Sequence, residues 1–412
     1  ARDLAMERAA LVRCLNWAGQ YTSHVHSDFG NHVLLEISGS LRLFGGLSAL
    51  RTKIAEGFAS LGYEACIAVA PTPRAALWLS RAGQAVTVSA IKNLSAHLGA
   101  LPLAATAWPD KVCRNLRDLG LRQLGDCLRL PRNGFGRRIG KAYLQELDQA
   151  LGREHDPRTA WQPPEYYCGR MELPMPVSKH DWLLHAIGRL LRELSGFLRA
   201  REAGIRRLQL YLQHEDAAAT RCVLHLLHEE RDAQRLLELL SERLHREVLP
   251  APVVAVRIRS DALRVLRRAP EQLFGQRERK AGVSMTADML VERLRARLGG
   301  EAVHGLCLVP EHRPESAWQV SEPGRDSDAL RVKERPFWLL DSPRRLPIRA
   351  HQPWLDGPLS VESGPERIET GWWDGKDVAR DYFRMRTHGG ICLWVFRERR
   401  GTRAWFLHGV FA

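Results

Sequence analysis

The hydrophobic and polar positions of the first hundred residues follow helical and strand periodicities in turn. Apolar residues at helical spacing predict three helices, at Leu4 to Trp17, Leu47 to Leu61 and Pro73 to Ala82. Short apolar runs between them predict strands at His32 to Ile37, Cys66 to Val69 and Ala85 to Val88. Strands and helices that alternate in this way indicate an α/β layer.

The pattern changes after Trp108 and Pro109 to short helices joined by glycines, in the runs LRDLGLRQLGDCLRLP and RNGFGRRIGKAYLQELDQALG. Leu119, Gly120 and Leu121 separate two of these helices, which is a helix-hairpin-helix pattern. The backbone N–H groups of such a hairpin can face a phosphate. Basic residues surround it, namely Arg114, Arg117, Arg122, Arg137, Arg138 and Lys141. Because glycine between two helices often only turns the chain, both interpretations stay open.

After the linker WQPPEYY, the periodicities predict the order β-α-β-β-α-β, which is the split βαβ arrangement. One face of its four-stranded sheet must pack against the two helices, so the other face is open to a partner. The predicted outward positions are polar or basic, at Arg206, Gln209, Gln213, Arg221, Arg257 and Arg259. These residues would suit contact with a nucleic-acid backbone, although an ordinary solvated face has the same composition.

Residues from Arg267 to about Arg349 are rich in Pro, Arg and Glu and contain one predicted helix, Ala287 to Leu298, so we interpret them as a connector. The last sixty residues are rich in aromatics and alternate as strands do, in the runs ICLWVF and AWFLHGVF. Turns at HGG and RRGTR join them. Two or more hairpins are therefore predicted in a small β unit.

Composition adds a strong basic excess to this picture. The chain has 412 residues and a formal net charge of +14, and 53 of its 61 cationic residues are Arg. Arg pairs with phosphate through a planar fork, so the excess favours a polyanionic partner, although a GC-rich genome also raises the Arg content. The globular composition excludes disordered and fibrous classes. No apolar run reaches the roughly 20 residues of a membrane span, so no membrane partner is expected.

The eight cysteines are scattered, without a CxxC pair. This spacing argues against a zinc site and a disulfide framework, so no metal is expected. Cysteines such as Cys66 and Cys222, which lie in apolar stretches, are predicted to be buried thiols in a reducing cytoplasm. The chain starts at Ala1 with neither Met nor a signal-type segment, so we expect a truncated N-terminus.

Several segments resemble a known family. The run LLEISGSLRLFGG, the helix after it and ACIAVAPTPRAALWLSRAG resemble the palm core of Y-family (UmuC/DinB-type) translesion DNA polymerases. Three segments are similar to the ImuB branch of that family, namely LRLFGG, GPERIETGWWDGKDVARDYF and WFLHGVFA. The resemblance covers nearly the whole chain and implies an α/β multidomain fold. The first three domains would be a palm-like domain at 1–108 without its first strand and fingers, a helix-hairpin-helix thumb at 109–162, and a little-finger domain of split βαβ type at 163–266. A connector at 267–350 and a β-rich protein-interaction region at 351–412 would follow.

Nucleotide transfer needs several carboxylates, because two Mg²⁺ ions require hard anionic ligands. Active members of the family carry two adjacent acids on the central palm strand and a third on the first strand. The matching strand here contains Glu36 as its only acid. The segment can be aligned with the family's palm strand in two registers. In one register, Asn31 and His32 occupy the positions of the acidic pair. In the other, Glu36 occupies one of those two positions. We therefore expect no catalytic residue and no cofactor. The alternative is an active polymerase whose remaining carboxylates precede Ala1.

The ImuB branch is regarded as non-catalytic. The resemblance therefore implies a cytoplasmic DNA-binding adaptor in SOS-induced error-prone translesion synthesis. The implied partners are primer-template DNA, a sliding clamp, the α-subunit of an error-prone replicative-type polymerase and an ImuA/RecA-type protein. A third interpretation is a hub that binds only proteins and never contacts DNA.

Two further segments are candidates for partner binding. PEQLFGQ offers Gln272, Leu273 and Phe274 as a clamp-binding segment, although Gln272 directly abuts the Leu-Phe pair, and the same residues could instead pack within the connector. The aromatic residues of the last region offer a protein-binding face, at Trp372, Trp373, Tyr382, Phe383, Trp394 and Trp405. The competing interpretations are the core of a small β domain and stacking on single-stranded bases.

Overall fold

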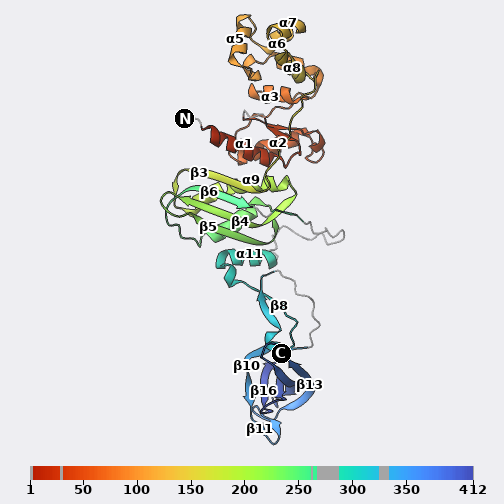
Figure 1. Cartoon of the computed structure of the whole chain (residues 1–412), viewed down its shortest axis with the longest axis vertical. Coiled ribbons are helices and arrows are strands. Elements are labelled where there is room, and N and C mark those ends of the chain that lie inside the picture. Colours follow the sequence, from red (N-terminus) through yellow and green to blue (C-terminus); the bar gives the residue numbers. More distant parts are fainter. Residues whose placement is uncertain (1–2, 28–30, 261–262, 267–286, 324–333, 412) are drawn as a thin grey trace. The chain divides into compact units, whose positions relative to one another are not determined.

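The computed structural model describes residues 3–27, 31–260, 263–266, 287–323 and 334–411. The chain forms two compact units, Ala1–Met285 and Thr286–Ala412. Figure 1 shows helices and strands mixed in the first unit, and a mainly β second unit. The mixed α/β multidomain fold expected from the sequence is therefore confirmed. In the part of the chain that the structure describes, no helix is both long and apolar enough to cross a membrane.

The N-terminal layer is built from α1 (Leu4–Ala18), α2 (Leu47–Ser60) and a short hairpin of β1 (Val25–Ser27) and β2 (Val33–Leu35). Its core contains Leu15, Trp17, Leu50, Ile54 and Leu61. Both helices lie where the periodicity predicts them. The strand predicted over His32 to Ile37 is shorter, so Glu36 lies beyond its end, before the 3₁₀ turn η1 (Ser38–Ser40).

The strands predicted at Cys66 to Val69 and Ala85 to Val88 are wrong. In the described residues these segments share only one isolated parallel bridge, between Val69 and Thr87. No ladder covers the first segment, so the Cys66 thiol is exposed, contrary to expectation. Cys222 is buried as predicted, because it lies inside a strand of a larger sheet.

A second core joins the following helices. They are α3 (Pro73–Arg81), η2 (Ile91–Asn93), α4 (Leu94–Gly99), η3 (Leu103–Thr106), α5 (Asp110–Asp118), α6 (Leu124–Leu128), α7 (Arg132–Arg138) and α8 (Lys141–Ala150). Trp108 packs edge-on against Trp78 of α3, with ring centroids 6.1 Å apart, and against Tyr143 of α8 at 5.3 Å. The domain boundary expected between residues 108 and 109 therefore falls inside one hydrophobic core.

The predicted split βαβ arrangement is confirmed. Its elements are β3 (Tyr167–Val177), α9 (His180–Arg199), β4 (Ala203–His214), β5 (Thr220–Glu230), α10 (Ala233–Leu244) and β6 (Val253–Ser260). The antiparallel strand order is β3-β6-β4-β5, and β7 (Leu263–Val265) pairs with the start of β4. Leu208, Leu210 and Leu212 are buried, on the face of the sheet against which α9 and α10 pack. Figure 1 shows α9 lying along this sheet. The opposite face carries the candidate site.

Helix α1 packs tightly against α9. The Trp17 ring lies between Gly57 of α2 and Gly196 of α9, and a Cβ atom at either glycine would overlap the ring. Beside it, Arg13 Nε lies 3.2 Å from Glu193 Oε2, and Tyr167 donates a hydrogen bond to the same carboxylate at 3.3 Å. Glu193 is 1% exposed, and burial raises its pKa. This contact joins the N-terminal layer to the split βαβ fold.

The second unit begins with the helix predicted at Ala287 to Leu298, which is confirmed as α11 (Ala287–Leu298). It continues through η4 (Gly300–Ala302), β8 (Gly305–Leu308), η5 (Pro314–Ser316), β9 (Trp318–Ser321), β10 (Trp338–Leu346), β11 (Ile348–Arg349), β12 (Gln352–Pro353), β13 (Ser360–Thr370), β14 (Val378–Arg386), β15 (Cys392–Glu398) and β16 (Trp405–Val410).

Five of these strands form one antiparallel sheet, in the order β10-β16-β15-β14-β13. The hairpins predicted from the aromatic alternation are thus confirmed. The expected boundary between residues 350 and 351 is wrong, because β10 precedes it and pairs with β16 in the same sheet. Alternating side chains build two separate cores, one around Val395 and Leu407 and the other around Tyr382 and Trp394.

Candidate nucleic-acid interface

The open face of the split βαβ sheet carries a row of basic residues around one tyrosine. The strand register places Arg170 of β3 opposite Arg257 of β6, Arg257 opposite Tyr211 of β4, and Tyr211 opposite Arg221 of β5. Adjacent rows add Arg259 and Arg207 on the same face. All five arginines are exposed. We call these five arginines and Tyr211 the sheet-face cluster.

Tyr211 organises the centre of this cluster. The Arg257 guanidinium lies 4.4 Å from the centroid of its ring, and that of Arg221 lies at 5.9 Å. The Tyr211 hydroxyl donates a hydrogen bond of 2.6 Å to Gln209 Oε1, which also accepts one from Arg221 at 3.3 Å. A cation over an aromatic ring is attracted by its quadrupole, so Tyr211 holds neighbouring like charges in place.

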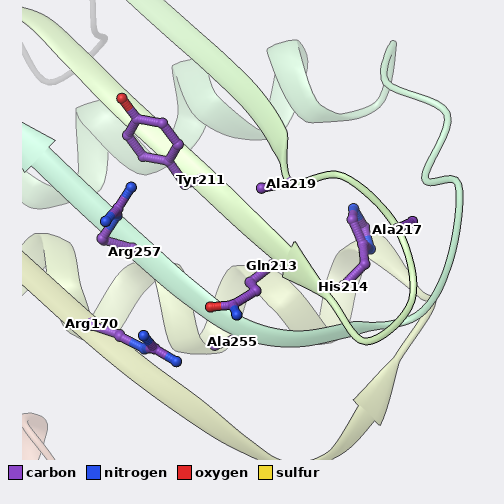
Figure 2. A pocket seen from close by; sticks show the side chains of 8 residues that line it. All are labelled: Arg170, Tyr211, Gln213, His214, Ala217, Ala219, Ala255 and Arg257. Carbon is purple, nitrogen blue, oxygen red and sulfur yellow. The ribbon is translucent and has the colours of Figure 1, made fainter.

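A hollow of about 300 Å³ lies beside Tyr211. Figure 2 shows Arg170, Tyr211 and Arg257, which come from three neighbouring strands, along one side of it. Gln213 and His214, at the end of β4, complete its polar lining. The hollow therefore offers guanidinium and amide donors side by side, which is the chemistry that phosphate oxygens require.

The structure corrects two of the outward positions predicted on this sheet. Arg206 lies at a bulge between Ile205 and Arg207 and is ion-paired with Glu229 at 3.0 Å. Gln209 shares the outer face but is only 6% exposed, because Tyr211 and Arg221 cover it. Gln213, Arg221, Arg257 and Arg259 are exposed as predicted.

Sequence reasoning missed Arg170, Arg207 and Tyr211. For Arg170 the alternation along β3 was a usable signal, since it shares its face with Cys168 two residues earlier. For Arg207 and Tyr211 the alternation of the buried Leu208, Leu210 and Leu212 was a usable signal, since it places odd-numbered residues of β4 on the opposite face.

The predicted hairpin is present between α5 and α6. Gly120 has φ +82°, which non-glycine residues rarely adopt, so glycine is required at this turn. Asp126 accepts hydrogen bonds from the backbone N–H groups of Gln123 and Arg122 at 3.0 and 2.9 Å, and these bonds lower its pKa. The start of α6 is thereby fixed next to the turn.

All six basic residues predicted around this hairpin are exposed. Among the residues that the structure describes, none of the six is ion-paired with a carboxylate: Arg114, Arg117, Arg122, Arg137, Arg138 and Lys141. Their neighbours Arg129 and Arg132 are different, because they pair with Asp126 and Asp148. The unpaired set therefore leaves six positive charges available to an anionic ligand.

Glu36, the acid of the palm-like segment, is used locally. Its Oε1 accepts a hydrogen bond of 2.9 Å from the backbone N–H of Ser38, and hydrogen bonds from Ser38 lower its pKa. The residue is exposed. Within the described ranges, no group of three or more His, Cys, Asp or Glu side chains could hold a metal ion. The Glu36 carboxylate is thus engaged by the first residue of η1.

The candidate partner-binding residues have different positions. Gln272, Leu273 and Phe274 lie outside the described residues. Trp372 and Trp373 are 80% and 58% exposed in the loop between β13 and β14. Tyr382 cannot contribute to a contact surface, because it is 1% exposed and stacks on Trp394 in the core. Phe383 is half-buried against Trp405.

Comparisons with known proteins place this chain close to one curated protein. Protein ImuB of Caulobacter vibrioides, in two strains, is 28% identical over 435 aligned residues, which cover 99% of this chain and 94% of ImuB. This similarity confirms the resemblance inferred from the sequence. No protein-family model matches the chain.

Solved structures that match part of the chain include a ternary complex of Dbh, with a TM-score of 0.32 and 15% identity over 63% of this chain and 78% of Dbh. DinB from Sulfolobus solfataricus has a TM-score of 0.32 and 16% identity over 64% of this chain and 78% of DinB.

Proposed function

We propose that this chain is a polymerase-like protein that binds primer-template DNA and acts as a non-catalytic adaptor in SOS-induced error-prone translesion synthesis. The observation that carries the proposal is the pair of basic surfaces in one compact unit, the sheet-face cluster and the six unpaired cations at the hairpin. The similarity to ImuB over 99% of the chain supports the adaptor role.

Both surfaces suit the DNA backbone. Arginine binds phosphate oxygens in a two-pronged manner, and the backbone N–H groups of a helix-hairpin-helix turn can face a further phosphate. The side chains that both surfaces present are guanidinium and ammonium groups, which pair with phosphate oxygens. We therefore infer backbone contacts that tolerate many sequences and weaken as salt concentration rises.

We expect no nucleotide incorporation by the full chain on a primer-template with Mg²⁺ or Mn²⁺. Two metal ions need several carboxylates, whereas Glu36 is the only acid of the segment His32 to Ile37, and its Oε1 accepts a hydrogen bond from the backbone N–H of Ser38. Primer extension, with DNA binding measured in the same buffer by fluorescence anisotropy, checks this. Glu36→Ala should change neither result. Incorporation that Glu36→Ala abolishes would support the alternative, an active Y-family polymerase.

Partner binding forms the second half of the proposal. The partners are a sliding clamp, an error-prone replicative-type polymerase α-subunit and an ImuA/RecA-type protein, in a cytoplasmic assembly. Gln272, Leu273 and Phe274 are the proposed clamp segment. Trp372 and Trp373 are proposed contacts for a protein partner, since exposed tryptophans often anchor interfaces.

The double substitution Leu273→Ala with Phe274→Ala should weaken clamp binding at least tenfold, because it removes both apolar anchors. DNA affinity should stay unchanged, since the basic surfaces are untouched. Pull-down of the purified clamp and anisotropy with primer-template measure the two effects. The matched control is Leu306→Ala with Leu308→Ala, which removes two exposed apolar side chains on β8. Equal clamp recovery by both double variants would remove the segment from the proposal.

A further inference from the structure

The arginines of the second unit divide into a paired set and an unpaired set. The paired set forms ion pairs with carboxylates, as in Arg335–Glu366, Arg367–Asp381, Arg386–Glu362, Arg399–Glu369 and Arg400–Asp377. Six exposed arginines have no carboxylate partner among the residues that the structure describes: Arg297 on α11, and Arg344, Arg345, Arg349, Arg397 and Arg403. Positive charge is therefore neutralised around β13 and β14, whereas the arginines of β10 and β11 and of the turn after β15 keep theirs.

Five of these six arginines, all except Arg297, lie at one end of the five-stranded sheet. Leu346, at the end of β10, is opposite Trp405 of β16, which is in turn opposite Arg397 of β15. Arg344 and Arg345 precede Leu346 on β10. Arg403 lies in the turn between β15 and β16, and Arg397 Nε donates to its carbonyl oxygen. Arg349 follows β10 in the short hairpin of β11 and β12. We call this set the terminal arginine cluster.

Two indole rings lie within this cluster. The Arg349 guanidinium is 5.0 Å from the centroid of Trp354, and that of Arg397 is 5.9 Å from the centroid of Trp405. Both tryptophans are partly exposed. Arginines bind the phosphates of a nucleic acid, whereas an accessible ring can stack on a base. A duplex offers few free base faces, so the combination favours a single strand.

We propose that the terminal arginine cluster is a second nucleic-acid site, which binds single-stranded DNA. Arg344, Arg345 and Arg349 contact phosphates, and Trp354 and Trp405 supply stacking surfaces. The site lies in the Thr286–Ala412 unit and is separate from the hairpin and the sheet-face cluster, which lie in the Ala1–Met285 unit. It therefore goes beyond the proposed binding of primer-template DNA.

The test replaces Arg344, Arg345 and Arg349 with Gln in the full chain. Affinity for a 12-nucleotide oligo-dT should fall about tenfold or more at 0.1 M salt. The slope of log affinity against log salt should become shallower by about 2, because each phosphate contact on a single strand contributes about 0.7. Affinity for blunt duplex DNA should stay within about twofold. Fluorescence anisotropy over a salt series measures all three quantities.

The matched control replaces Arg367, Arg386 and Arg400 with Gln, which removes the same formal charge from arginines that are ion-paired. It should leave oligo-dT binding nearly unchanged. On the unsubstituted chain, oligo-dT should slow hydrogen exchange in β10, β11 and β16. Equal losses in the two triple variants, or no protection of these strands, would overturn the proposal. The proposal would also be overturned if the variant at Arg344, Arg345 and Arg349 kept its affinity for oligo-dT but lost binding to an acidic protein or to anionic vesicles. Failure of duplex binding in the wild type would instead count against the proposed function.

Discussion

Replacing Arg207, Arg221 and Arg257 with Gln should weaken primer-template binding on the order of 100-fold at about 0.15 M salt. The three arginines lie on one open face of the sheet, and none is ion-paired with a carboxylate among the described residues. Each lost phosphate contact should also flatten the slope of log affinity against log salt by about 0.9. Three contacts therefore predict a slope that is shallower by about 2.7. Anisotropy titrations over a salt series measure both effects.

The control for this prediction lies in the same fold. Three other arginines of this fold are ion-paired: Arg206 with Glu229, Arg235 with Glu230 and Arg243 with Glu247. Replacing these three arginines with Gln removes the same formal charge but no unpaired guanidinium. DNA affinity should then change by less than about fivefold. If both triple variants lost affinity equally, net charge alone would explain binding, and the sheet-face cluster would lose its assigned role.

Gly196→Ala should destabilise the contact between α1 and α9 by about 3 kcal/mol. The added Cβ would overlap the Trp17 ring, and the ring cannot move away because Gly57 of α2 packs against its other end. Since interiors are densely packed, the overlap must be relieved by shifting a helix. Hydrogen exchange of the α1, α2 and α9 amides, with mass-spectrometric readout, measures the free energy of local opening.

Gly134→Ala is the matched substitution. Gly134 also lies within a helix, α7, but no heavy atom stands within 4 Å of the position of its added Cβ. Alanine favours a helix by up to about 1 kcal/mol over glycine, so this variant should be neutral or slightly stabilised. Unchanged protection of α1 and α9 in Gly196→Ala would show that Trp17 is not clamped between the two glycines.

The sequence predicts well those elements whose periodicity is long. The helix at Leu47, the split βαβ order and the aromatic hairpins all follow from patterns repeated over many residues. Short segments are less certain, since four apolar residues such as Cys66 to Val69 do not form a ladder without a partner strand. In the structure, Cys66 to Val69 shares one isolated bridge with Ala85 to Val88.

The site was predicted only in part because pairing and burial depend on tertiary neighbours. The alternation of leucines along β4 places Arg207 on the open face, but nothing in the sequence reveals that Glu229 neutralises its neighbour Arg206. The aromatic character that suggested Tyr382 as a contact residue is equally typical of a core, where the structure places it. Likewise, β10 pairs with β16, which lies far along the chain. The change in composition used to place a boundary at residue 350 therefore could not reveal that β10 belongs to the same sheet.

The central claim is that this chain holds DNA through its basic surfaces. The most direct measurement is the affinity of the unsubstituted full chain for primer-template DNA over a range of salt concentrations. We expect a steep loss, with a log-log slope of about −4 or steeper, as several phosphate contacts require. Weak affinity that hardly changes with salt would contradict the claim and would favour a hub that binds only proteins.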